Sequence, residues 1–225
     1  TGIDRIDAKD ILNGGLGKGE IGVITAPTGV GKSHMLVNLG CAAIKNGFNV
    51  IHYTFELTET ATGLRYDSNI CQIPSNQVPE RKEEVIEYYK EHGEKLGKLM
   101  IKEYPTGTAT VQTLRSHIEK LSLKGFIPQV LIIDYADIMR SSRQYDSMRH
   151  ELKKVYEDLR NLAMEKNLPI WTASQSNRDS ANSDIVGLEN MAESYGKAQV
   201  ADVVISISRK PAEKAEGFGR LYIAK

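Results

Sequence analysis

Residues 20–33, EIGVITAPTGVGKS, decide the fold of this chain. The run 20–25 is short and apolar, as expected of a buried strand. The next eight residues, 26–33, match the Walker A pattern: a small residue, four free positions, then Gly-Lys-Ser/Thr. An amphipathic helix is predicted over 32–46 and ends at Gly47. A strand, a glycine-rich loop and a helix in this order predict a phosphate-binding loop at the carboxyl end of a strand.

The rest of the chain alternates strand and helix patterns, which favours a mostly parallel, twisted sheet with helices on both faces. We therefore interpret residues 1–225 as a single α/β domain with a P-loop NTPase core. Further strands are predicted over 50–55, 98–104, 130–134, 169–175, 202–208 and 221–224. Further helices are predicted over 59–72, 80–95, 110–125 and 146–167.

Composition narrows the class of protein. Apolar residues make up 40% of the 225 residues and charged residues 26%, which is ordinary for a globular domain. No apolar run approaches the roughly 20 residues of a membrane span, so no membrane partner is expected. The formal charge is zero, which argues mildly against non-specific nucleic-acid binding but allows a local basic stripe. Two cysteines without metal-like spacing, and no signal peptide, favour a reducing, cytoplasmic compartment.

The predicted phosphate site combines backbone and side-chain groups. Gly29 and Gly31 let the backbone wrap around an anion, and the helix that follows adds its positive N-terminal dipole. Lys32 is expected to reach the β and γ phosphates, and the Ser33 hydroxyl to bind Mg²⁺. Asp134 ends the apolar strand VLIID at the Walker B position, so it is the second expected Mg²⁺ ligand. The predicted nucleotide-binding residues are Ala26, Pro27, Thr28, Gly29, Val30, Gly31, Lys32 and Ser33.

Hydrolysis also requires a group that activates or orients the attacking water. Many ATPases place a glutamate directly after the Walker B aspartate, but Tyr135 occupies that position here. Glu56 ends the second strand, at the sheet edge where ligands bind, and is the preferred candidate. Asp137 and Glu59 are weaker candidates. Gln175 ends the strand PIWTASQ, where its amide could contact the γ-phosphate.

Five motifs in order resemble the RecA-like, C-terminal motor domain of DnaB-type replicative helicases from bacteria and phages. The resemblance covers nearly the whole chain. After the entry segment TGIDRIDAKDILNGGLGKGE (1–20), the motifs are APTGVGKS (26–33), HYTFELTE (52–59), LIIDYADIM (131–139), TASQSNR (172–178) and AESYGKAQVADVVISISR (192–209). The similarity of HYTFELTE supports Glu56 as the water-activating glutamate, and that of TASQSNR supports Gln175 as the phosphate sensor.

The resemblance implies a function and an assembly. Members of that family bind ATP and Mg²⁺ between neighbouring subunits of a six-membered ring. Single-stranded DNA passes through the ring, which moves along one strand and displaces the other during replication. The expected partners are therefore further copies of the chain and single-stranded DNA, with a primase and a helicase loader as further candidates. The expected compartment is a bacterial cytoplasm or that of a phage-infected host.

The resemblance also assigns roles to residues outside the phosphate site. Arg209 matches the arginine near the nucleotide base, and Lys225 matches a sensor lysine that precedes the arginine finger by two positions. Tyr195 stands where the family commonly has glycine, so a main-chain contact to DNA phosphate is expected to shift and Lys197 to compensate for it. Arg178 is the third candidate for DNA binding. We expect the chain to be a fragment without the finger or the N-terminal domain, and therefore to bind nucleotide but hydrolyse it poorly.

Two other functions share this core. A RecA-type recombinase forms a filament on DNA, but it usually carries a longer polymerisation segment ahead of the core. A KaiC-like signalling ATPase binds protein partners and no DNA, and the neutral charge is compatible with it. That group often shows paired adjacent glutamates at the end of the second strand, whereas Glu56 stands alone here with Glu59 one turn away.

Overall fold

The structure is a computed structural model that describes residues 1–143, 145–177, 187–188 and 195–225. Its strands are β1 Ile21–Ala26, β2 Val50–Thr54, β3 Leu99–Glu103, β4 Val130–Asp134, β5 Ile170–Gln175, β6 Val203–Ser208 and β7 Arg220–Ile223. Its α-helices are α1 Asp4–Asp7, α2 Lys32–Lys45, α3 Glu59–Cys71, α4 Lys82–His92, α5 Val111–Leu123, α6 Met148–Lys166, α7 Tyr195–Val200 and α8 Pro211–Ala215. Two 3₁₀ turns also lie within the described residues, η1 Gly93–Lys95 and η2 Ala136–Ile138.

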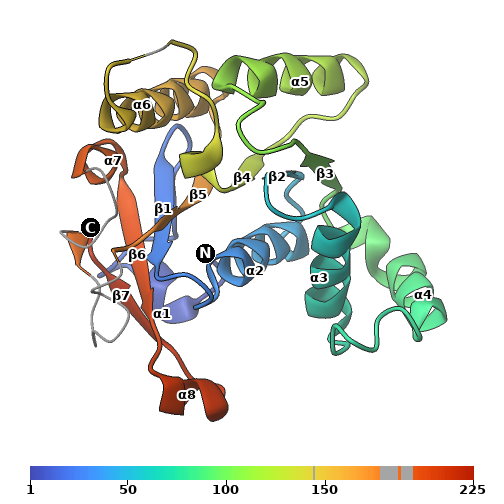
Figure 1. Cartoon of the computed structure of the whole chain (residues 1–225). Coiled ribbons are helices and arrows are strands. Elements are labelled where there is room, and N and C mark those ends of the chain that lie inside the picture. Colours follow the sequence, from blue (N-terminus) through green and yellow to red (C-terminus); the bar gives the residue numbers. More distant parts are fainter. Residues whose placement is uncertain (144, 178–186, 189–194) are drawn as a thin grey trace.

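One sheet runs through the molecule in the order β3-β2-β4-β5-β1-β6-β7 (Figure 1). The first six strands in this order are parallel to their neighbours, and β7 pairs antiparallel with β6. The predicted α/β class with a mostly parallel sheet is therefore confirmed. Because β1 lies between β5 and β6, the loop after β1 lies in the interior of the sheet's carboxyl edge and not at its end.

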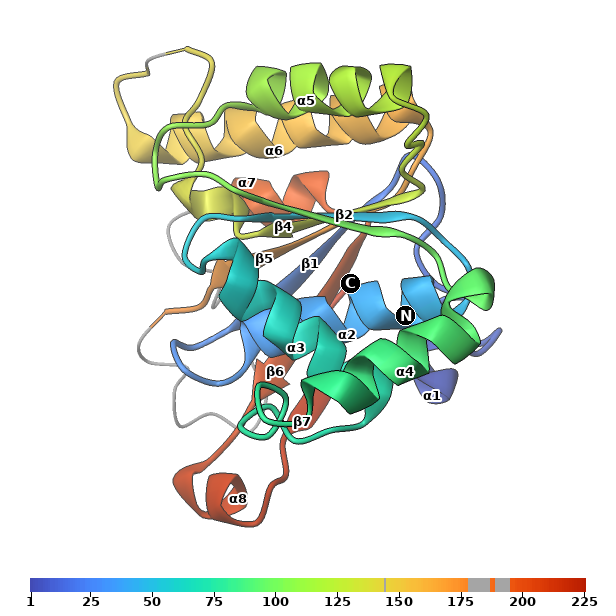
Figure 2. The ribbon, with the colours of Figure 1, turned by 90° about the vertical axis from the view of Figure 1, so that its right-hand side faces the viewer.

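Helices cover both faces of the sheet (Figure 2). Helices α5, α6 and α7 lie on one face, and α2, α3 and α4 lie on the other. Alternate residues of each strand supply the two cores: Val23 and Ile133 pack toward α5 and α6, whereas Ile24 and Ile132 pack toward α2 and α3. Burial on both faces explains why β1 and β4 are continuous apolar runs.

Hydrogen-bonded caps fix several helix ends. Thr58 accepts a hydrogen bond from Ala61 at the start of α3, and Thr110 and Thr113 form a reciprocal capping box at the start of α5. The predicted strands and long helices are confirmed with small shifts at their ends. One helix is shorter than predicted, because 80–95 divides into α4 and the turn η1. The short helices α1, α7 and α8 and the turn η2 were not predicted.

Gly22 in β1 provides a test of the packing on the α2 face. A Cβ atom at this position would lie 2.3 Å from the ring of Trp171 on the neighbouring strand β5. We expect Gly22→Ala to lower the free energy of unfolding by about 1–3 kcal/mol, the usual range for overpacking a core. The matched control is Gly93→Ala, where a Cβ would meet nothing within 4 Å. Urea denaturation of both variants would show equal stabilities if the Trp171 contact were unimportant.

Candidate nucleotide site

The predicted catalytic residues come from adjacent strands. Strands β2, β4, β5 and β1 are consecutive neighbours in the sheet. The register pairs Thr54 with Asp134 and Ala26 with Gln175, so these positions lie at one carboxyl edge. Glu56 follows β2 by two residues at the same edge. The structure therefore brings the Walker A loop, Asp134, Glu56 and Gln175 to the same edge of the sheet. This is the edge at which ligands bind in open α/β sheets.

The Walker A loop has the backbone conformation of an anion cradle. Gly29 and Gly31 have φ angles of 75° and 123°, in the region that side-chain-bearing residues rarely adopt. Helix α2 begins directly after its N-cap residue Gly31, which has no side chain to cap the first backbone N–H groups. Those N–H groups and the helix dipole are the elements that bind a phosphate. The Lys32 ammonium donates hydrogen bonds to the carbonyls of Ala26 (3.2 Å) and Pro27 (3.3 Å), within the same loop.

The charge of Lys32 interacts with the negative charges of the acidic groups at the site. Burial lowers the pKa of Lys32, and the negative charges of Glu56, Asp134 and Asp137 oppose that shift. Burial also raises the pKa of Asp134 to about 6, while a hydrogen bond to Ser33 and the charge of Lys32 act in the other direction. A bound cation would hold Asp134 ionised, because a positive charge favours the carboxylate over the acid.

The residues at this edge fit a magnesium ion. Asp134 is 1% exposed, and its Oδ1 has no hydrogen-bond partner among the described residues. A buried carboxylate oxygen without a partner is costly unless a ligand satisfies it. Mg²⁺ prefers oxygen ligands and commonly binds through one or two carboxylates together with substrate phosphates. Asp134 and Ser33 would hold such an ion.

Tyr135 connects the predicted base to the predicted sensor. Its hydroxyl accepts a hydrogen bond of 3.0 Å from the Gln175 amide. Burial, the negative charge of Glu56 and a hydrogen bond to that carboxylate raise the pKa of Tyr135 to about 12. The residue that replaces the usual glutamate after the Walker B aspartate thus joins Glu56 to Gln175. Sequence reasoning noted this replacement but did not assign Tyr135 a role.

The two weaker base candidates are engaged elsewhere. Glu59 accepts hydrogen bonds from Lys102 (3.2 Å) and from the backbone of Glu103 (3.1 Å) on β3. Asp137 accepts hydrogen bonds from Tyr156 and Lys197 through its two separate oxygens. Glu56 is exposed at the site. The geometry therefore favours Glu56 over both alternatives.

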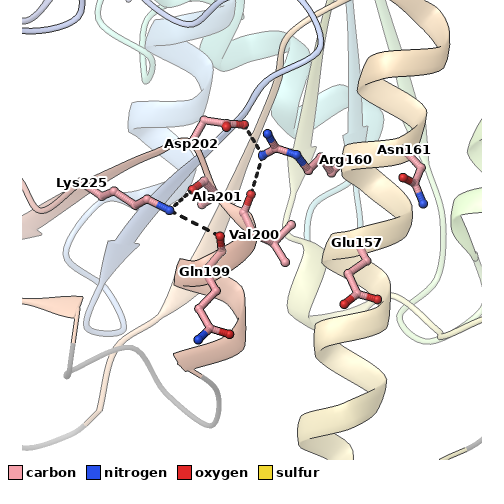
Figure 3. Close-up of a pocket in the computed structure, with 8 residues that line it drawn as sticks. All are labelled: Glu157, Arg160, Asn161, Gln199, Val200, Ala201, Asp202 and Lys225. Atoms are coloured by element: carbon pink, nitrogen blue, oxygen red, sulfur yellow. Dashed lines mark hydrogen bonds and ion pairs between the residues drawn. The ribbon is translucent and has the colours of Figure 1, made fainter.

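Lys225 lies away from this domain's own cradle. Its ammonium donates to the backbone carbonyls of Ala201 (2.7 Å) and Gln199 (3.4 Å) at the end of α7 (Figure 3). It also donates to the Ala198 carbonyl at 3.1 Å. Its backbone pairs with Val204 near the beginning of β6, toward the edge opposite the Walker A loop. The role of Lys225 as a sensor therefore stays a prediction, because the side chain does not lie at this domain's own phosphate loop.

The predicted DNA-binding residues have mixed outcomes. Lys197, the expected compensating phosphate ligand, is 1% exposed, and its ammonium contacts Asp137 at 2.8 Å. Its predicted contact with DNA phosphate stays a prediction. Tyr195 begins α7, but its side chain lies outside the described part of the structure, as does the whole of Arg178. Arg209 follows β6, and its guanidinium donates to the Lys214 carbonyl at 3.1 Å. Its predicted contact with the base stays a prediction.

Among the described helices, none combines the length and the apolar character needed to cross a membrane.

Comparisons with known proteins identify relatives of the whole domain. The DnaB-like replicative helicase of Enterobacteria phage T4 is 32% identical over 206 residues, covering 88% of this chain and 43% of that protein. The replicative DNA helicase DnaB of Helicobacter pylori (strain ATCC 700392 / 26695) is 22% identical over 204 residues, covering 89% of this chain and 42% of that protein. This chain thus spans less than half the length of either relative.

Solved structures share the fold. A DnaB-like replicative helicase, described together with its interactions with primase, superposes with a TM-score of 0.83 at 17% identity, covering 100% of this chain and 55% of that one. The model of the DnaB-like helicase C-terminal domain matches residues 1–225. The Walker A loop, the strand-end residues and this match agree: the chain belongs to the DnaB-like helicase C-terminal domain family.

Proposed function

We propose that this domain hydrolyses Mg²⁺-bound ATP and couples the reaction to movement along single-stranded DNA and to duplex unwinding during replication. The observation that carries the proposal is the convergence of four adjacent strand ends. Each contributes one component of phosphoryl transfer: a phosphate loop, a cation-binding carboxylate, a candidate base and a candidate sensor. Phosphoryl transfer depends mainly on such positioning and on charge stabilisation.

In this proposal each residue has a defined task. The backbone of residues 26–33 surrounds the phosphates, and Lys32 neutralises charge on the β and γ groups. Ser33 and Asp134 would hold Mg²⁺, which would supply positive charge close to the phosphate oxygens. The Glu56 carboxylate accepts a proton from the attacking water, and the Gln175 amide contacts the γ-phosphate. Arg209 lies against the base.

The assembly is a six-membered ring, with Lys225 of each domain directed at the nucleotide of its neighbour. The position of Lys225, bonded to the end of α7 and away from its own Walker A loop, supports a role between molecules. DNA would contact the ring through the segments that contain Arg178 and Tyr195. A primase and a helicase loader are further partners, and the compartment is a bacterial or phage-infected cytoplasm.

The test is ATP hydrolysis by the full-length protein with and without single-stranded DNA, at low and moderate salt. A DNA motor should show strong stimulation that falls steeply as salt rises, because salt competes with phosphate contacts. Unwinding of a forked duplex then separates a helicase from a recombinase filament. ATP hydrolysis that ignores DNA at every salt concentration would contradict the proposal and favour a signalling ATPase.

A further inference from the structure

A buried charged cluster lies directly behind the candidate sensor. Asp137 Oδ2 accepts hydrogen bonds from the Lys197 ammonium (2.8 Å) and the Ser174 hydroxyl (2.9 Å). Its Oδ1 accepts from the Tyr156 hydroxyl (2.8 Å). Lys197 also donates to Ser174 at 3.2 Å, and its ammonium lies 5.9 Å from the centre of the Tyr156 ring. Every charged or polar group of this cluster therefore has a partner.

The cluster joins three segments that are distant in sequence. Asp137 lies in η2, three residues after Asp134, and Ser174 is the residue before Gln175 on β5. Lys197 lies on α7, which packs between α6 and the sheet (Figure 2). The backbone N–H of Gln175 also points at Asp137 Oδ2, with a separation of 3.4 Å. One carboxylate therefore contacts both the sensor strand and α7.

A gain in the stability of the fold does not by itself explain a buried ion pair. Removing two charges from water costs about as much as their attraction returns, and apolar residues of similar volume often do as well or better. A buried lysine is also rare, and Lys197 is 1% exposed. The ion pair does supply hydrogen bonds of defined geometry, and these fix the end of β5 relative to α7.

We propose that Asp137 and Lys197 are positioning residues that hold Gln175 in place and transmit its displacement to α7. The inference rests on the proposed function, in which Gln175 contacts the γ-phosphate. When Gln175 follows the phosphate, Ser174 and Asp137 move with it, and the Lys197 ammonium carries the movement to the helix. The pair thereby connects the nucleotide site to α7, which begins at Tyr195, one of the proposed DNA contacts.

The test uses Asp137→Asn, Lys197→Met and the double variant in the full-length protein. Each single variant leaves one buried charge without its partner, so each should unfold at a lower temperature than the wild type. The double variant removes both charges and should recover most of the loss. We expect it nevertheless to lose the stimulation of ATP hydrolysis by single-stranded DNA, with the KM for ATP unchanged. A pair with only a structural role would keep that stimulation once stability had returned.

The matched control is the partly buried ion pair of Lys154 and Asp158 on α6, whose charged atoms lie 2.6 Å apart. Lys154→Met combined with Asp158→Asn removes the same two charges without touching the sensor strand. This double variant should keep both its DNA stimulation and its KM.

A second measurement tests the role of the Asp137–Lys197 pair in the absence of DNA. Hydrogen exchange of the α7 backbone amides should change when Mg²⁺ and a non-hydrolysable ATP analogue bind to the wild type, and should not change in the Asp137→Asn/Lys197→Met variant. Unchanged exchange in the wild type overturns the inference, as does a change that persists in the double variant. If DNA fails to stimulate the wild type, the proposed function fails, and the exchange result still supports or overturns the role of the pair.

Discussion

Lys32→Ala should abolish almost all ATP hydrolysis, with kcat falling about 100- to 1,000-fold and affinity for ATP falling as well. Loss of one preorganised group that stabilises transition-state charge typically has an effect of this size. The ammonium lies within the Walker A loop and near the negative charges of Glu56 and Asp134, and these charges would repel a phosphate if Lys32 were absent. Steady-state kinetics, together with the binding of a fluorescent ATP analogue, measure the two effects.

Lys45→Ala is the control for this prediction. Lys45 is the last residue of the same helix α2, and its exposed ammonium bonds to Asn69. Its removal should leave both kcat and ATP affinity at wild-type values. If Lys32→Ala retained hydrolysis within a factor of about ten, a single-group contribution of the usual size would be absent and the phosphate role of Lys32 would be wrong.

Glu56→Gln should separate binding from chemistry. The amide has nearly the same shape as the carboxylate but cannot accept the proton of the attacking water. We expect kcat to fall about 100- to 10,000-fold, the usual contribution of a general base. The KM for ATP should change little, because Glu56 lies at the end of β2 and outside the Walker A loop. Single-turnover kinetics with a separate measurement of nucleotide binding would distinguish the two effects.

Glu59→Gln provides the comparison, since Glu59 is three residues away and its carboxylate bonds to Lys102 and the backbone of Glu103. Turnover in this variant should stay close to that of the wild type. A larger loss of kcat in Glu59→Gln than in Glu56→Gln would reverse the assignment of the base.

Much of the fold follows from local patterns. The parallel strands β1 and β4 were predictable because burial on both faces requires continuous apolar residues. The long helix α6 was predictable because its apolar residues recur at 4-3-4-3 spacing. Strand order and the antiparallel direction of β7 depend on pairing between distant segments, which no local pattern encodes.

The candidate site also contains residues that local sequence predicts and residues whose contacts depend on distant parts of the chain. The Walker A loop and Asp134 carry short motifs whose chemistry is local, so the sequence sufficed to place them. The burial of Lys197 could not be predicted, because lysine is among the residue types least often buried and its partner Asp137 lies 60 residues away in the chain. The role of Tyr135 also depends on strand order, since β4 must lie between β2 and β5 for its hydroxyl to reach both neighbours.

Helix α7 is attached to the rest of the domain through Lys225, Arg160 and Asp137. Lys225 holds the last carbonyls of this helix, and Arg160 bonds to the Val200 carbonyl at 2.7 Å. Asp137 holds the same helix through Lys197. A helix of six residues is only about 9 Å long and too short to bend appreciably. In the proposed assembly, a shift of α7 that preserves these bonds would carry the Lys225 ammonium with it, so hydrolysis in one domain would move the group that we propose to face the next domain's triphosphate.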